Sequence, residues 1–188
     1  MNYFEIVLLT LAISFGVFKM LSEAGVEYCF TSGERFRIAM VFAVFKGILM
    51  LLGFWITGLF QQWLTGSGHI VIIAIFLVLG LKIIFESIKL KPGERTYDLN
   101  NSVILVLAAL AANTDGFIAG IAFAFSGVEA VNIAALLFGF TFLVSWSGLY
   151  YGKKKGKTPQ FSRPGIAGGL LLLGYALFLL LERTGSII

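Results

Sequence analysis

The sequence predicts an all-α protein that spans a membrane with six transmembrane helices, arranged as two inverted three-helix repeats. Three observations support this fold class. Of the 188 residues, 59% are hydrophobic and only 13% are charged, whereas a soluble domain carries about 25% charged residues. Six apolar stretches are each long enough to cross a bilayer, and most basic residues fall in alternate connections between them. We therefore expect residues 1–188 to form a single transmembrane domain.

The predicted spans use nearly all of the chain, because a helix needs about 20 apolar residues to cross about 30 Å of hydrocarbon. Their approximate limits are Tyr3 to Leu21, Ile38 to Phe60, Ile70 to Ile88, Ser102 to Phe125, Ala130 to Tyr151 and Gly165 to Leu181. We interpret the N-terminal stretch as the first span rather than as a cleavable signal peptide, since no basic residue precedes it and Lys19 ends it. Cys29 is the only cysteine, which excludes an intrachain disulfide and a CxxC motif.

Each of the first three spans contains a lysine. Lys19 lies near the end of the first span and Lys82 in the third, and we expect both side chains to extend to the headgroups. Lys46 lies about two turns inside the second span, which is too deep for an unstrained reach to the surface. Lys46 therefore needs a partner within the protein.

Asp115, near the middle of the fourth span, is the only acid deep in an apolar segment. An ionised carboxylate there costs about 2.5–3.5 kcal/mol even on a lenient scale, so it should face a partner or a water-filled cavity. Asn113 and Thr114 add oxygen atoms beside it, and Gly116 and Gly120 allow close approach of another helix or a substrate. Such donors suit Mn²⁺, Mg²⁺ or a proton, which makes Asp115 the candidate ion-binding and metal-ligating residue.

Two interpretations of Asp115 stay open at this point. It binds a transported ion, or it is an inert polar residue paired with a lysine. We hypothesise that Lys46 and Asp115 form a buried ion pair, which is either static or broken when a substrate or a proton binds Asp115.

The fifth and sixth spans carry small and polar residues. Ser145, Trp146 and Ser147 make the fifth span partly polar, and we favour hydrogen bonding between helices over a role in lining a pathway. Glycines recur in the sixth span, where they let backbones approach closely in lipid. These two spans are therefore expected to pack tightly.

The two halves of the chain look related. Residues 12–18 and 111–117 fall at the same depth of the first and fourth spans, and a Leu-Gly step recurs at Leu79-Gly80 and Leu173-Gly174. An odd number of spans per half means that a duplicated copy enters the membrane in the opposite orientation, as in many secondary transporters. We place repeat 1 at about 1–90 and repeat 2 at about 100–188, with Ser14 as a further candidate site residue.

The basic residues predict the orientation of the chain. The connections after the first, third and fifth spans contain Arg35, Arg37, Lys89, Lys91, Arg95, Lys153, Lys154, Lys155, Lys157 and Arg163. The opposite side holds only Arg183. By the positive-inside rule, those three connections are cytoplasmic and both termini lie outside.

Several motifs resemble the MntP-type manganese efflux pumps of bacteria, a six-helix group related to the lysine-exporter superfamily. The motifs are Ser14 with Phe18, Arg37 leading into Phe42 and Phe45, Leu52-Gly53-Phe54-Trp55, residues 76–86 and, most specifically, Asn113-Thr114-Asp115-Gly116-Phe117-Ile118-Ala119-Gly120. The family has a membrane-embedded aspartate in each repeat, and the resemblance implies that Asp115 is one of them. In the first repeat, Gly16 stands where the family has the other aspartate, and Lys46 stands where an amide or an acid is usual.

The expected function is a transporter in the bacterial inner membrane, an exporter of a small cation that uses Asp115, with alternating access between the two halves. The resemblance implies Mn²⁺ as the transported ion, and no permanently bound cofactor is expected. The expected partners are the lipid bilayer and a small cation or proton, without nucleic acid; a homodimer stays open. The alternative is a non-transporting structural or accessory subunit with a buried Lys-Asp pair. An enzyme is disfavoured, because no catalytic pair stands beside Asp115.

Overall fold

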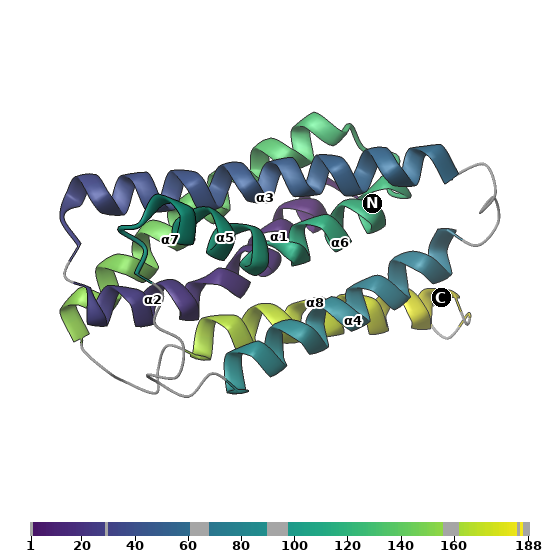
Figure 1. Ribbon diagram of the computed structural model, residues 1–188. Coiled ribbons are helices and arrows are strands. Elements are labelled where there is room, and N and C mark those ends of the chain that lie inside the picture. Colours follow the sequence, from purple (N-terminus) through teal and green to yellow (C-terminus); the bar gives the residue numbers. More distant parts are fainter. Residues whose placement is uncertain are drawn as a thin grey trace.

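A computed structural model describes residues 2–28, 30–60, 68–89, 98–155, 162–183 and 185. Its elements are α1 (Tyr3–Ser14), the 3₁₀ turn η1 (Phe15–Val17), α2 (Phe18–Glu27), α3 (Ser32–Phe60), α4 (Gly68–Lys89), α5 (Ser102–Ala112), α6 (Thr114–Ala124), α7 (Ala130–Lys155) and α8 (Ser162–Arg183). They form six helical segments long and apolar enough to cross a membrane, and the described ranges contain no strand. The predicted all-α membrane fold is confirmed (Figure 1).

Two of the six spans are broken, which the hydropathy did not predict. The first consists of α1, η1 and α2, and Gly16, a poor helix former, lies in the 3₁₀ turn. The fourth is divided into α5 and α6 at Asn113, whose φ of −99° and ψ of 13° are not helical. Asparagine is favoured at such positions because its side chain competes with the helical hydrogen bonds.

The spans also extend beyond their predicted limits at the basic end of the bundle. The first segment continues to Glu27 instead of ending at Leu21, and α3 begins at Ser32 instead of Ile38. Hydropathy falls as charged residues appear, but a helix can continue as an amphipathic one. Lys19 and Glu23 illustrate this, since they form a pair at 4.0 Å on successive turns of α2.

The helices pack in pairs, with α4 beside α8 and with α3 against both α6 and α7. Glycines allow the closest approaches: Gly53 of α3 lies against the Phe117 carbonyl, and Gly120 of α6 lies against the Met50 carbonyl. Both termini lie toward the end of the bundle where α3 ends and α4 begins (Figure 1). The inverted relation of the two halves stays a prediction.

The two Leu-Gly steps meet through Gly80 and Leu173 rather than through their glycines, since a Cβ on Gly80 would lie 2.9 Å from Leu173 Cγ. A Cβ on Gly80 would meet the Gly169 carbonyl at 2.9 Å, and one on Gly169 would meet the Gly80 carbonyl at 2.8 Å. Gly174 faces open space. Helix rotation therefore selects Gly169 rather than Gly174 as the partner of Gly80.

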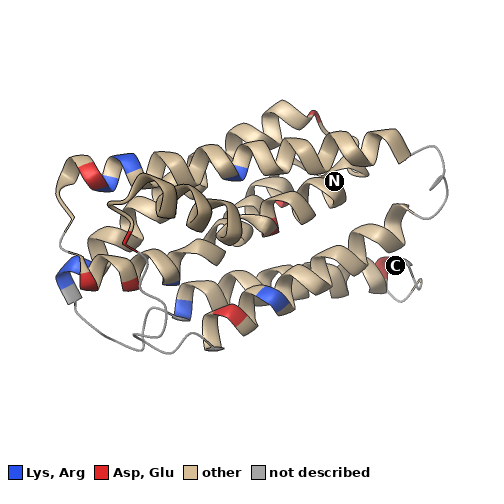
Figure 2. Cartoon of the chain, in the orientation of Figure 1, with Lys and Arg blue, Asp and Glu red and all other residues tan. Residues whose placement is uncertain are grey.

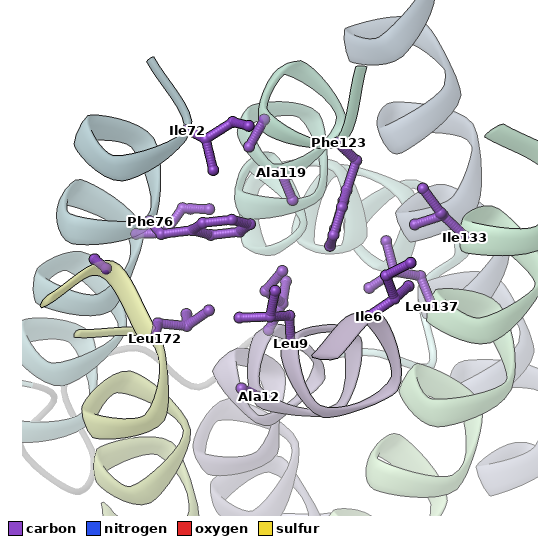
Figure 3. Close-up of a cluster of buried hydrophobic side chains, with 14 of the residues drawn as sticks. Ile6, Leu9, Ala12, Ile72, Phe76, Ala119, Phe123, Ile133, Leu137 and Leu172 are labelled. Carbon is purple, nitrogen blue, oxygen red and sulfur yellow. The ribbon is translucent and has the colours of Figure 1, made fainter. Parts of the chain in front are cut away.

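One of two apolar cores among the described residues fills the half of the bundle nearer the termini, and the other, which includes Val17, Phe42 and Leu105, lies toward the opposite end. Figure 3 shows side chains from α1, α4, α6, α7 and α8 converging on one another. The labelled members are Ile6, Leu9, Ala12, Ile72, Phe76, Ala119, Phe123, Ile133, Leu137 and Leu172. Phe76 and Phe123 meet edge to face at 5.8 Å between ring centroids, an arrangement that adds to the stability from burial.

Charged residues gather at the opposite end, where α2 ends and α3 begins (Figure 2). There, Arg37 of α3 donates a hydrogen bond to the Asn100 carbonyl at 3.0 Å. The Arg35 guanidinium lies over the rings of Trp146 and Tyr150, 5.9 and 5.7 Å from their centroids. Lys91, Arg95 and Lys157 lie outside the described residues. Which end faces the cytoplasm stays a prediction.

Candidate functional site

Asp115 lies in the first turn of α6, directly after the break in the fourth span. Its side chain is 2% exposed, and its Oδ1 accepts a hydrogen bond from the Gly116 amide at 2.8 Å. The N-terminus of a helix carries partial positive charge and unpaired amides, so it stabilises a carboxylate. The break at Asn113 thus places this favourable helix end inside the bundle.

Lys46 of α3 is fully buried beside Asp115. Its Nζ lies 2.6 Å from Asp115 Oδ2, and it donates a second hydrogen bond to the Ile13 carbonyl at 3.4 Å. The predicted contact between these two charges is therefore present. Removing one member of such a pair leaves an uncompensated charge inside the protein.

Glycines on both sides leave room for this ion pair. A Cβ on Gly16 would lie 2.8 Å from Asp115 Oδ2, and a Cβ on Gly116 would lie 3.2 Å from Lys46 Cδ. Gly16, which interrupts the first span, thus faces the carboxylate directly. A larger side chain at either glycine requires the pair to shift.

Asn113 contributes an unused acceptor. Its Nδ2 donates to the Phe42 carbonyl at 3.0 Å, one turn before Lys46 on α3. Its Oδ1 is buried and has no hydrogen-bond partner within the described ranges. Because a buried acceptor without a donor is costly, this oxygen is suited to receive a cation or a water molecule.

Ser14 is the last residue of α1, directly before the 3₁₀ turn that breaks the first span. Its Oγ donates to the Thr10 carbonyl at 2.8 Å and lies 3.1 Å from Thr141 Oγ1 on α7. One turn further along α7, the Ser145 hydroxyl is buried without a partner within the described ranges. The preference for hydrogen bonding between helices at Ser145 therefore lacks support here. Thr141 was missed, although its spacing of four residues from Ser145 puts both on one helix face.

Thr114 points away from the buried pair. It is exposed, and its Oγ1 accepts a hydrogen bond from Lys82 Nζ at 2.9 Å. Lys82 also lies 3.5 Å from Glu86 Oε1. The structure thus brings Lys46 and Asp115 together, while Thr114 joins α6 to α4.

Lys19 and Lys82 have hydrogen-bond partners on neighbouring helices, and their extension to the headgroups stays a prediction. The Lys19 side chain is buried, and its Nζ donates to the Ser87 carbonyl at 2.8 Å. The Lys82 ammonium bonds to Thr114 in the interior of the fourth span. Both ammonium groups find acceptors on neighbouring helices, which hydropathy along one segment does not reveal.

The arrangement offers oxygen donors of the kind that hard cations prefer, namely the Asp115 carboxylate, Asn113 Oδ1 and the Ile13 carbonyl. One carboxylate oxygen is already occupied by the Lys46 ammonium. Within the described ranges, no three His, Cys, Asp or Glu side chains are grouped so that they could hold a metal ion. A metal at this place therefore depends on a single carboxylate.

Comparison with known proteins connects the chain to one group. The family described as "Putative manganese efflux pump" (Mntp) matches residues 30–180. "Putative manganese efflux pump MntP 1" of Wolinella succinogenes is 30% identical over 179 residues, which cover 95% of this chain and 97% of the relative. "Putative manganese efflux pump MntP" of Clostridium botulinum is 27% identical, with 98% and 96% covered. No solved structure matches this chain.

Proposed function

Because this chain belongs to the manganese efflux pump family Mntp, we propose that it is a multi-pass membrane exporter of a small cation, with Asp115 as the central ligand. The names of the relatives make manganese the first candidate substrate. The observation that carries the site assignment is a buried carboxylate at the break of a discontinuous span. Secondary transporters bind ions at such breaks, because the interrupted helix frees polar backbone groups.

The proposed transport cycle uses alternating access between two inverted halves, about 1–90 and about 100–188. Two features support this division. The first and fourth spans are both broken, at η1 and at Asn113. The second span packs on the fourth through Gly53 and Gly120, and the fifth packs on the first through Gly148 and Gly25. An inverted duplication produces this exchange of partners.

Lys46 sets a condition on cation binding. In the structure its ammonium contacts Asp115 Oδ2, so the pair as a whole is neutral. A neutral pair attracts a divalent cation less strongly than a free carboxylate does. We therefore propose that Lys46 leaves Asp115 when the cation binds. Asp115, Asn113 and Ser14 then supply oxygen atoms, and Thr114 lies at the edge of the site.

A second candidate function is that of a structural or accessory membrane subunit. The short contact between Lys46 and Asp115 favours it, because a permanently closed pair needs no substrate. Under this alternative, the pair holds α3 against α6 and no ion passes.

Survival and manganese content of an efflux-deficient bacterial strain under manganese stress distinguish the two. The strain expresses the wild-type chain, Asp115→Asn, Lys46→Gln, or the matched control Asp98→Asn, whose carboxylate is exposed. We expect the wild type and the control to lower manganese content and Asp115→Asn to leave it unchanged. A well-expressed wild type that does not lower manganese rejects manganese export, and retained export in Asp115→Asn rejects the site.

A further inference from the structure

Three polar side chains lie together on the surface of the bundle beside the buried pair. Lys82 Nζ donates to Thr114 Oγ1 at 2.9 Å and lies 3.5 Å from Glu86 Oε1. The Lys82 and Glu86 side chains are 26% and 47% exposed, and Thr114 is exposed as well. Lys82, Glu86 and Thr114 are called the entrance cluster below.

Lipid is a poor environment for these groups. A charged side chain at the centre of a bilayer costs about 2.5–3.5 kcal/mol or more, and Thr114 lies at the break in the middle of the fourth span. Lys82 lies six residues before Ile88, the last residue of the third apolar segment, which is about 9 Å along a helix. Its ammonium bonds to Thr114 and lies 3.5 Å from Glu86 Oε1. Contact of these polar groups with water is therefore more favourable than contact with hydrocarbon, although exposed apolar side chains such as Leu81 and Phe85 lie on the same helix.

The entrance cluster adjoins the buried pair along the backbone of α6, because the Thr114 side chain itself points away from Asp115. Glu86 contacts Lys82, Lys82 contacts Thr114, and Thr114 precedes Asp115 in the chain, whose carboxylate contacts Lys46. One apolar core lies toward the termini (Figure 3), and the second lies toward the opposite end between helices other than α4. Glu86 lies near the C-terminal end of α4, and its carboxylate is partly exposed there.

We propose that the entrance cluster lines a water-filled passage by which a hydrated small cation reaches Asp115 from the end of the bundle where α4 terminates. Glu86 attracts the cation at the mouth, and the Lys82 ammonium moves aside as the cation passes. The direction of use rests on the proposed function, because an exporter takes up its cation from the cytoplasm and the basic connections predict that this end is cytoplasmic. Access of water does not depend on transport.

The test measures how fast introduced thiols react with a charged, membrane-impermeant methanethiosulfonate reagent applied to inside-out vesicles. In a Cys29→Ser background, Thr114→Cys and Glu86→Cys report on the entrance cluster. Leu81→Cys, on the turn of α4 that holds Lys82, and Leu143→Cys in α7 are matched controls, with side chains 40% and 62% exposed. We expect the two cluster thiols to react at least tenfold faster than both controls, since a thiol must ionise in water to react.

Reaction of both cluster thiols at the rate of Leu81→Cys overturns the passage. So does slow reaction of Thr114→Cys together with an oxidatively formed disulfide between two chains, because a second copy then covers this face. Fast reaction from the cytoplasmic side upholds the passage, even where the cells fail to export manganese. That failure rejects the proposed function alone. Fast reaction only from the opposite side overturns the proposed direction.

Discussion

Lys46 and Asp115 form a neutral unit inside an otherwise apolar bundle. Each is almost completely inaccessible, and burial of either charge alone is expensive. Among the contacts of the described residues, the Asp115 carboxylate accepts hydrogen bonds from the Lys46 ammonium and the Gly116 amide. Gly16, which faces it, has no side chain that could add a third. Under the proposed function, the stability of the protein and the binding of an ion therefore depend on the same two residues.

The first prediction concerns the coupling of this pair. Lys46→Gln and Asp115→Asn each leave one buried charge unpaired, and each should lower the free energy of unfolding by about 3–5 kcal/mol. The double variant should lose less than the sum of the two, since neither charge remains. Denaturation of purified protein in detergent measures all three. Strictly additive losses contradict an energetic coupling between the two side chains.

The second prediction concerns Gly16. A Cβ there lies 2.8 Å from Asp115 Oδ2, so Gly16→Ala should displace the carboxylate and reduce export at least severalfold. Gly174→Ala is the control, because nothing lies within 4 Å of its Cβ and alanine is the better helix former by about 1 kcal/mol. Cellular manganese content and melting temperature are measured for both. Equal behaviour of the two variants contradicts a role for the space at Gly16.

Part of the site follows from the residue types alone. Asp115 and Lys46 are conspicuous because each is a charged residue well inside an apolar segment, and their pairing could be proposed on energetic grounds. The bonds of Ser14 with Thr141 and of Lys82 with Thr114 could not. They join residues distant in the chain, and polar residues of this kind also occur in spans without any such contact.

Backbone groups beside the breaks in the first and fourth spans reach the site. Ile13, near the end of α1, accepts a hydrogen bond from Lys46 at its carbonyl, and the break before α6 directs a helix N-terminus at Asp115. The crossing of α3 with α6 brings the two sides together, and it depends on glycines at the contact.

The third prediction tests this crossing. Gly120→Val places a branched side chain against the Met50 carbonyl of α3, and it should lower the melting temperature or abolish folding, because overpacking costs about 1–3 kcal/mol. Gly139→Val adds the same residue to α7 where nothing lies within 4 Å of the Cβ. Thermal denaturation in detergent compares them. A Gly120→Val protein as stable as Gly139→Val contradicts the close packing.

The two ends of the bundle differ in chemistry. Apolar cores occupy both halves of the bundle, but charged groups gather at the end where α2 ends and α3 begins (Figure 2). This polarity agrees with an orientation in which the basic end faces the cytoplasm, and it leaves the entrance cluster on the side where an exporter would load.

The fourth prediction tests the orientation. Alkaline phosphatase fused after Ile188 should be active, and the same enzyme fused after Asp98 should be inactive, since its disulfides form only outside the cytoplasm. Green fluorescent protein at the same positions should give the opposite pattern. Activity of the phosphatase after Asp98 contradicts the predicted topology.

The sequence by itself determined the membrane class and the number of spans, and it indicated the two charged residues that pair inside the bundle. These follow from the local balance of apolar and charged residues, because hydrocarbon imposes the same cost on a charge wherever the chain folds. Only the tertiary structure decided where the spans break, that Gly80 meets Gly169, and which acceptors hold Lys19 and Lys82. Those contacts depend on the rotation and tilt of each helix, which side-chain packing between segments far apart in the chain sets.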